Sequence, residues 1–130
     1  MCSWVNRVTE EPAEVFRVAA QCQQQKESIA IAFYGNIVDL LEYAVNHNIK
    51  IDLLSDQTSC HAVYEGGYCP QGISFEERTE LLRSGHAGFK EMVDATLRRH
   101  YELVKTLADA FSCLRPARFS DLLEDPCKKA

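Results

Sequence analysis

Residues 28–54 have the sequence SIAIAFYGNIVDLLEYAVNHNIKIDLL, which predicts a strand, a helix and a second strand in succession. Residues 28–34 are almost continuously apolar, as is typical of a buried parallel strand. After the glycine that ends this run, Asn36 is a good N-cap for a helix, with Asp39 as its reciprocal capping partner. Residues 49–54 return to an apolar pattern and predict the next strand. This order within about thirty residues is typical of a right-handed βαβ unit.

Helices are also predicted before and after this unit in the sequence. A helix over residues 12–26 begins with a proline, which suits the first helical turn. Residues 74–83 begin with the capping box SFEE and predict a short helix. The longest helix is predicted over residues 87–111, where an apolar stripe recurs at helical spacing. Residues 62–73 contain glycines and a proline, and we expect them to form an ordered loop that leads to the short helix.

Length and charge limit the classes to which this chain can belong. It has 130 residues, a formal net charge of −5 and 46% hydrophobic residues, and such a length suits one globular domain. The negative charge argues against nucleic-acid or anionic-membrane partners, which would normally require a basic face. No run approaches the roughly 18 apolar residues of a membrane span. Residues 1–7 lack the basic and apolar regions of a secretory signal, so we expect a cytoplasmic protein.

The cysteines are numerous but widely scattered. They are Cys2, Cys22, Cys60, Cys69, Cys113 and Cys127. No CxxC motif and no pair with zinc-finger spacing occurs, so we expect reduced thiols and no metal site. One alternative remains open, in which Cys60, His61 and Cys69 supply three ligands to a metal ion, although adjacent ligands on one loop give it little support.

Polar side chains gather where the two predicted strands end, at Gly35-Asn36 and at residues 55–61, SDQTSCH. In βαβ units, ligands bind in the crevice beyond the carboxyl ends of the strands. Both places also have a purely structural explanation, because a glycine permits a tight turn, Asn36 caps a helix, and Asp, Thr and Ser favour turns. The phosphate-binding patterns GxGxxG and GxxxxGK[ST] are absent from the chain. Neighbouring residues rarely point at each other, so we do not expect Cys60 and His61 to form a nucleophile–base pair.

Several of these segments together resemble the urocanate hydratase (urocanase) family. The motif D-Q-T-S-x-H at residues 56–61, followed by G-G-Y-x-P at residues 66–70, is specific to that family. Further similarity lies in residues 29–36, in the capping box and in the longest helix, and extends from about Trp4 to Phe111. The resemblance implies a cytoplasmic enzyme of histidine breakdown that adds water to urocanate and gives imidazolonepropionate. In this family a tightly held NAD+ acts as an electrophile.

The resemblance also implies where the cofactor lies. The predicted fold class is α/β, a partial Rossmann-like three-layer fold with a short parallel sheet and flanking helices. Residues 1–112 would form part of the NAD-binding lobe, and residues 113–130 a divergent, loose tail. The family's NAD+ contacts fall on Asn36, Ile37, Gln57, Thr58, Ser59, Cys60, His61, Tyr68 and Cys69.

The chain also departs from the family pattern. Family members are several times longer, with a glycine-rich phosphate loop upstream and a reactive cysteine downstream of the matching region, so no residue here is assigned a catalytic role. Ala62 stands where members usually have Asn or Asp, and the match ends near residues 112–118. We therefore expect the isolated chain to lack hydratase activity and to bind NAD+ weakly at most, with the missing core or a second copy as its partner. The alternative is a non-enzymatic interaction module that has kept the scaffold and lost the ligand.

Overall fold

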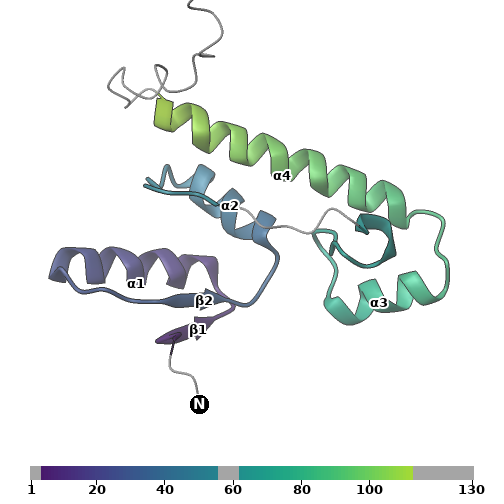
Figure 1. The fold of residues 1–130 in the computed structure, drawn as a ribbon, viewed down its shortest axis with the longest axis horizontal. Helices are drawn as coiled ribbons and strands as arrows, with labels where there is room; N and C mark the ends of the chain where they lie inside the picture. Colours follow the sequence, from purple (N-terminus) through teal and green to yellow (C-terminus); the bar gives the residue numbers. More distant parts are fainter. Residues whose placement is uncertain (1–3, 56–61, 113–130) are drawn as a thin grey trace, which may run out of the picture.

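The computed structural model describes residues 4–55 and 62–112, which form a short parallel sheet flanked by helices (Figure 1). Strand β1 (Arg7–Thr9) pairs in parallel with strand β2 (Ile31–Phe33), and Val8 lies opposite Ala32. Helix α1 (Pro12–Gln25) connects the two strands and packs on them. The α/β class predicted from the sequence, with its short parallel sheet and flanking helices, is confirmed.

Helix α1 is fixed to the sheet at its first turn. Pro12 occupies that turn. Glu14 accepts a hydrogen bond of 2.6 Å from the hydroxyl of Thr9 and forms an ion pair with Arg7. These two donors, first Thr9 and then Arg7, hold the pKa of the Glu14 carboxyl below its ordinary value. At the other end Lys26 adopts a φ of 58°, and its left-handed conformation closes the helix. The helix predicted over residues 12–26 is confirmed.

The prediction of a βαβ unit over residues 28–54 is wrong in its second strand. The βαβ unit of the structure consists instead of β1, α1 and β2. Residues 49–54 form no strand. A strand is stable only where its backbone groups pair with a neighbour, and among the described residues the sheet consists of β1 and β2 alone. Without a strand or a neighbour to cover it, Leu53 in this apolar run is 87% exposed. Strand β1 was missed because three residues are too few to show a period.

Helix α2 (Ile37–Asn46) follows β2 and packs beneath α4 (Phe89–Ser112), as Figure 1 shows. Their contact forms one hydrophobic cluster, in which Val38, Leu41 and Leu103 are almost completely buried. The apolar stripe predicted along residues 87–111 is confirmed, because its residues supply one side of this cluster. The core thus places the N-terminus of α2 beside the middle of α4.

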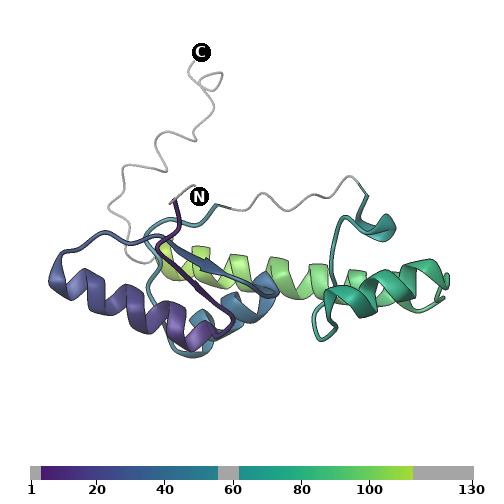
Figure 2. The same cartoon turned by 90° about the horizontal axis from the view of Figure 1, so that it is seen from below.

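A second hydrophobic cluster lies at the N-terminal half of α4. It joins that helix to the 3-10 helix η1 (Val63–Glu65) and to α3 (Phe75–Arg83), which lie at the end of α4 away from α1 and the sheet (Figure 2). Its buried residues are Tyr68, Phe89 and Val93. The capping box predicted for α3 is present, because Ser74 accepts from the backbone of Glu77 and the Glu77 carboxylate accepts from the backbone of Ser74.

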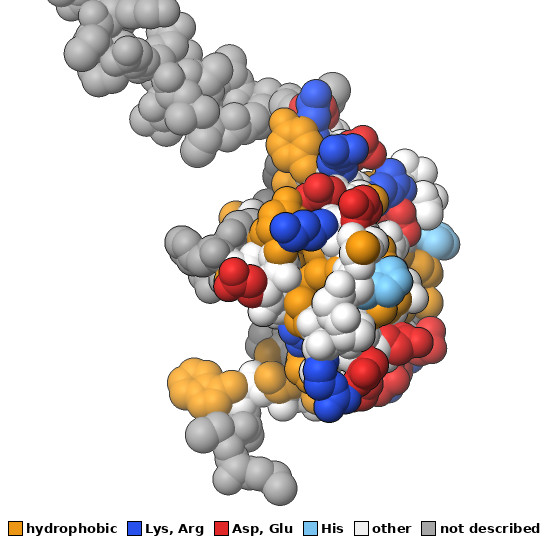
Figure 3. All heavy atoms as spheres, turned by 90° about the vertical axis from the view of Figure 1, so that its right-hand side faces the viewer, with side chains coloured by type: hydrophobic (Ala, Val, Ile, Leu, Met, Phe, Trp, Pro, Cys, Tyr) orange, Lys and Arg blue, Asp and Glu red, His pale blue; other side chains and the backbone are white. Residues whose placement is uncertain are grey.

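The surface mixes charges of both signs. On the face shown in Figure 3, acidic and basic side chains alternate with apolar ones, with no single-sign field. None of the helices within residues 4–55 and 62–112 combines the length and the apolarity that crossing a bilayer requires.

Among the described residues, we expect substitutions in the α2–α4 cluster to cause the largest loss of stability. Leu103 is 1% exposed, so we expect Leu103→Ala to lower the free energy of unfolding by about 2–5 kcal/mol, because it leaves a cavity. The matched control is Leu53→Ala at an exposed position, for which we expect a change within about 0.5 kcal/mol. Urea unfolding followed by circular dichroism measures both, and equal losses would contradict the assignment of the core.

Candidate functional site

The candidate site lies where the N-terminus of α2 meets residues 66–72, the loop that follows η1. Strand β2 leads into α2 through Gly35, where a Cβ atom would lie 2.5 Å from the ring of Phe33. The tight connection therefore requires glycine or a displaced ring. It places Asn36 at the carboxyl end of β2, which is the end at which parallel α/β sheets bind ligands.

Asn36 joins the two segments directly. Its Oδ1 accepts a hydrogen bond of 3.0 Å from the Val38 N–H, and its Nδ2 donates one of 2.9 Å to the Cys69 carbonyl oxygen. The N-cap predicted from the sequence is confirmed. The predicted reciprocal bond from Asp39 is wrong, because the Asp39 carboxylate accepts from Gln71 instead. Both ends of the Asn36 amide are thus used inside the protein.

Tyr68 lies in the core. It is 5% exposed, packs with Phe89 and Val93, and its hydroxyl lies 3.2 Å from His100 Nδ1. The aromatic ring therefore anchors the loop on α4. We expect any ligand contact at this position to involve the backbone.

Cys69 is half-buried, and its thiol lies 3.8 Å from the Pro70 carbonyl oxygen. Burial raises the pKa of the Cys69 thiol, and the nearby Arg78 guanidinium offsets this only in part. A thiol with a raised pKa remains protonated at neutral pH and is a poor nucleophile. What Cys69 offers to the site is its backbone, which Asn36 already holds.

The structure thus brings together some of the predicted contact residues. Asn36 and Cys69 are bonded to each other, and Ile37 follows Asn36 as the exposed first residue of α2. Residues 57–61, with Gln57, Thr58, Ser59, Cys60 and His61, lie outside the described residues, and so does the metal alternative, which needs Cys60 and His61. In the part of the chain that is described, no group of three or more His, Cys, Asp or Glu side chains is arranged to hold a metal ion.

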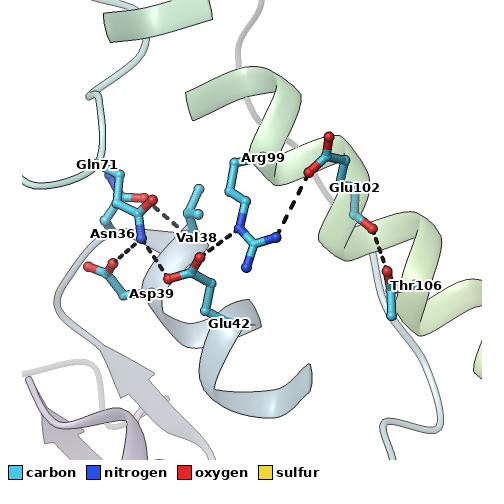
Figure 4. Close-up of polar contacts among 8 residues, drawn as sticks. All are labelled: Asn36, Val38, Asp39, Glu42, Gln71, Arg99, Glu102 and Thr106. Atoms are coloured by element: carbon cyan, nitrogen blue, oxygen red, sulfur yellow. Dashed lines mark hydrogen bonds and ion pairs between the residues drawn. The ribbon is translucent and has the colours of Figure 1, made fainter. Parts of the chain in front are cut away.

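Sequence reasoning missed a set of polar residues that holds the loop on the two helices, which we call the polar clasp. It consists of Asp39, Glu42, Gln71, Thr96 and Arg99. Figure 4 shows Gln71 reaching Asp39 and Glu42 on α2, with Arg99 reaching the same Glu42 from α4. The spacing of Asp39 from Glu42, and of Thr96 from Arg99, puts each pair on one helix face, but nothing in the sequence indicates that these faces meet.

Beside the polar clasp lies an open groove of about 520 Å³. Its lining residues are Asp39, Gln71, Gly72, Met92, Ala95 and Thr96. Helix N-termini favour polar and anionic groups, so the α2 end of the site suits part of a polar ligand.

Acidification should weaken the polar clasp through Glu42. The hydrogen bond from Arg99, helped by one from Gln71 and opposed by partial burial, holds the pKa of the Glu42 carboxyl below its ordinary value of 4.5. The stability that this carboxylate contributes is therefore present above about pH 4.5 and is lost as the pH falls through the lower, folded-state pKa. We expect the free energy of unfolding, measured with urea, to fall more steeply below pH 4.5 in the unmodified protein than in Glu42→Gln.

The matched control is Glu10→Gln, at an exposed position. We expect this variant to keep the steep pH dependence of the unmodified protein. Parallel curves for the unmodified protein and Glu42→Gln would show that Glu42 contributes nothing to the pH dependence.

Comparison with known proteins shows the family of the chain. Residues 1–113 match the family model described as the Urocanase Rossmann-like domain. The chain is 41% identical over 107 residues to a probable urocanate hydratase of Dictyostelium discoideum, and 36% identical over 110 residues to urocanate hydratase of Mus musculus. It is 34% identical over 111 residues to urocanate hydratase of Homo sapiens.

These matches cover 81–82% of this chain and 16% of each relative. The chain therefore spans only about one sixth of the length of the relatives that it matches. It belongs to the urocanase family and matches the Rossmann-like domain of that family.

Proposed function

We propose that this chain forms part of the NAD+-binding lobe of a urocanate hydratase. The complete protein would add water to urocanate and give imidazolonepropionate, with NAD+ as the electrophile, in the cytoplasm. The observation that carries the proposal is the hydrogen bond between Asn36 and Cys69, which are 33 residues apart in the sequence. Both are positions at which the family resemblance implies cofactor contacts.

The surroundings of this bond support the proposal. Asn36 stands at the carboxyl end of a parallel strand and at the N-terminus of a helix, where α/β folds bind nucleotides. The loop that carries Cys69 is anchored in the core by Tyr68, so its backbone is held in a fixed position. A fixed backbone loses little conformational freedom when a ligand binds.

We expect the 130-residue chain to bind NAD+ with a dissociation constant above the micromolar range. The reason is that it contains no glycine-rich phosphate loop to supply backbone donors to the pyrophosphate. An NMR titration with NAD+ should shift the amide signals of Asn36, Ile37 and Cys69. Asn36→Ala should reduce these shifts, whereas Asn46→Ala, the same change at the opposite end of α2, should not. Micromolar affinity in calorimetry would contradict the expected weakness, and unchanged shifts in Asn36→Ala would contradict the site.

The same preparation tests the fragment interpretation. We expect no loss of the ultraviolet absorbance of urocanate when the chain is incubated with urocanate and NAD+. Turnover would overturn the proposal that residues beyond this chain are needed for catalysis.

A non-enzymatic interaction module is the second candidate function, and exposed apolar side chains near β1 favour it. Trp4 is 83% exposed and Val8 66% exposed. Among the described residues each strand pairs with only one neighbour, so both have a free edge. In this alternative a second copy of the chain covers the surface that the enzyme's core would otherwise cover.

Sedimentation velocity tests the second candidate. If the module interpretation is correct, the chain should sediment as a dimer, and Val8→Ser should make it monomeric while the control Leu53→Ser leaves the dimer intact. A monomer across the concentration range would exclude self-association as the function of this surface.

A further inference from the structure

We propose that Gln71 is a positioning residue, which fixes the distance between the Cys69 backbone and the N-terminus of α2 and thereby sets ligand affinity at that place. The effect on affinity rests on the proposed function, whereas the effect on geometry does not. Gln71 lies two positions beyond Cys69 and is not among the contacts that the family resemblance implies.

Both donors of the Gln71 side-chain amide bind carboxylates on α2. Its Nε2 donates to Asp39 Oδ1 at 2.7 Å and to Glu42 Oε2 at 3.0 Å. A side-chain amide has two N–H donors, so both are used. Each acceptor is a carboxylate, and hydrogen bonds to an ionised acceptor are stronger than those between neutral groups.

The backbone of Gln71 is committed to α4. Its N–H donates to Thr96 Oγ1 at 3.0 Å, and that hydroxyl in turn donates to the Met92 carbonyl oxygen at 2.9 Å. The position of the hydroxyl is therefore set by α4 itself. One residue thus ties the loop to both helices that form the core.

The acceptor on α2 is held in place as well. Glu42 Oε1 accepts from Arg99 Nε at 2.6 Å, and Arg99 also lies 3.8 Å from Glu102. The carboxylate that receives Gln71 is thus fixed by α4, so the polar clasp closes on itself. A closed network of charged hydrogen bonds resists displacement more than a single bond does.

This geometry controls the site because two ties join the same two segments. Asn36 binds the Cys69 carbonyl oxygen, and Asp39, three residues further along α2, binds Gln71, two residues further along the loop. The Asn36 Oδ1 caps Val38 at the same time, which limits how far the Asn36 amide can turn to follow a shift of the loop. A loop that moved at Gln71 would therefore change the space between Asn36 and Cys69.

Three variants test the proposal. Gln71→Glu keeps the size of the side chain but places a third carboxylate beside Asp39 and Glu42, and should displace the loop. Gln71→Lys places a positively charged donor beside the carboxylates of Asp39 and Glu42, and should keep the loop in place. Gln23→Glu, at an exposed position on α1, repeats the charge change away from the site.

Two backbone amides report the geometry without any ligand. The Val38 N–H bonds to the Asn36 side chain, and the Gln71 N–H bonds to Thr96. Hydrogen exchange of these two amides, measured by NMR, therefore reports whether Asn36 and Gln71, one residue from each tie, keep their positions. We expect both to exchange about tenfold faster in Gln71→Glu, as for the loss of one hydrogen bond to a charged group, and at the normal rate in Gln71→Lys and Gln23→Glu. Unchanged exchange in Gln71→Glu, or equally fast exchange in Gln71→Lys, would overturn the proposal.

An NMR titration with NAD+ then tests the effect on affinity. We expect about tenfold weaker binding in Gln71→Glu and recovery in Gln71→Lys. If NAD+ shifts no amide signals of the unmodified chain, the proposed cofactor site in this chain fails while hydrogen exchange still decides the positioning role. If the unmodified chain binds and Gln71→Glu binds equally well, the control of affinity by Gln71 is refuted and the proposed function stands. Far-ultraviolet circular dichroism confirms that each variant is folded.

Discussion

The packing of α2 beneath α4 is the contact on which the rest of the structure depends. Val38 and Leu41 lie in the first half of α2, and they bury themselves against Leu103 of α4. Because Asn36 directly precedes that half, the hydrophobic contact also fixes the place of the N-cap and of everything bonded to it. The candidate site is therefore positioned by the core, and its polar bonds refine a geometry that apolar burial has already set.

Polar contacts then give the α2–α4 pair its register. Apolar packing tolerates sliding of one helix along another more readily than paired charges do, since a charged hydrogen bond has a defined length and direction. Arg99 binds Glu42 at the side of the contact between the two helices. Gln71 uses the same carboxylate, so the loop follows the relative position of the helices. A shift of α2 relative to α4 would therefore alter the site even if residue 36 remained asparagine.

The parts of the fold that could be predicted from the sequence are those set by local rules. Pro12 and the capping box at Ser74 indicate where helices begin, and the stripe along residues 87–111 identifies the buried face of α4. The second strand could not be placed, because the apolar run at residues 49–54 does not show whether a neighbouring strand is available. Asn36 was predicted because capping is local, whereas Gln71 owes its role to residues on two other elements, which only the folded structure brings together.

The residue types of the loop motif G-G-Y-x-P can be explained by the fold. Gly66 has a φ of 101° and a Cβ atom there would lie 2.7 Å from the Arg78 side chain, Tyr68 lies in the core, and Pro70 is almost completely buried. Each of these residues thus has a structural reason for its type. The variable position of the motif is Cys69, whose carbonyl oxygen, common to every amino acid, is the group that Asn36 binds. The loop can therefore keep its tie to α2 whatever side chain stands at that position.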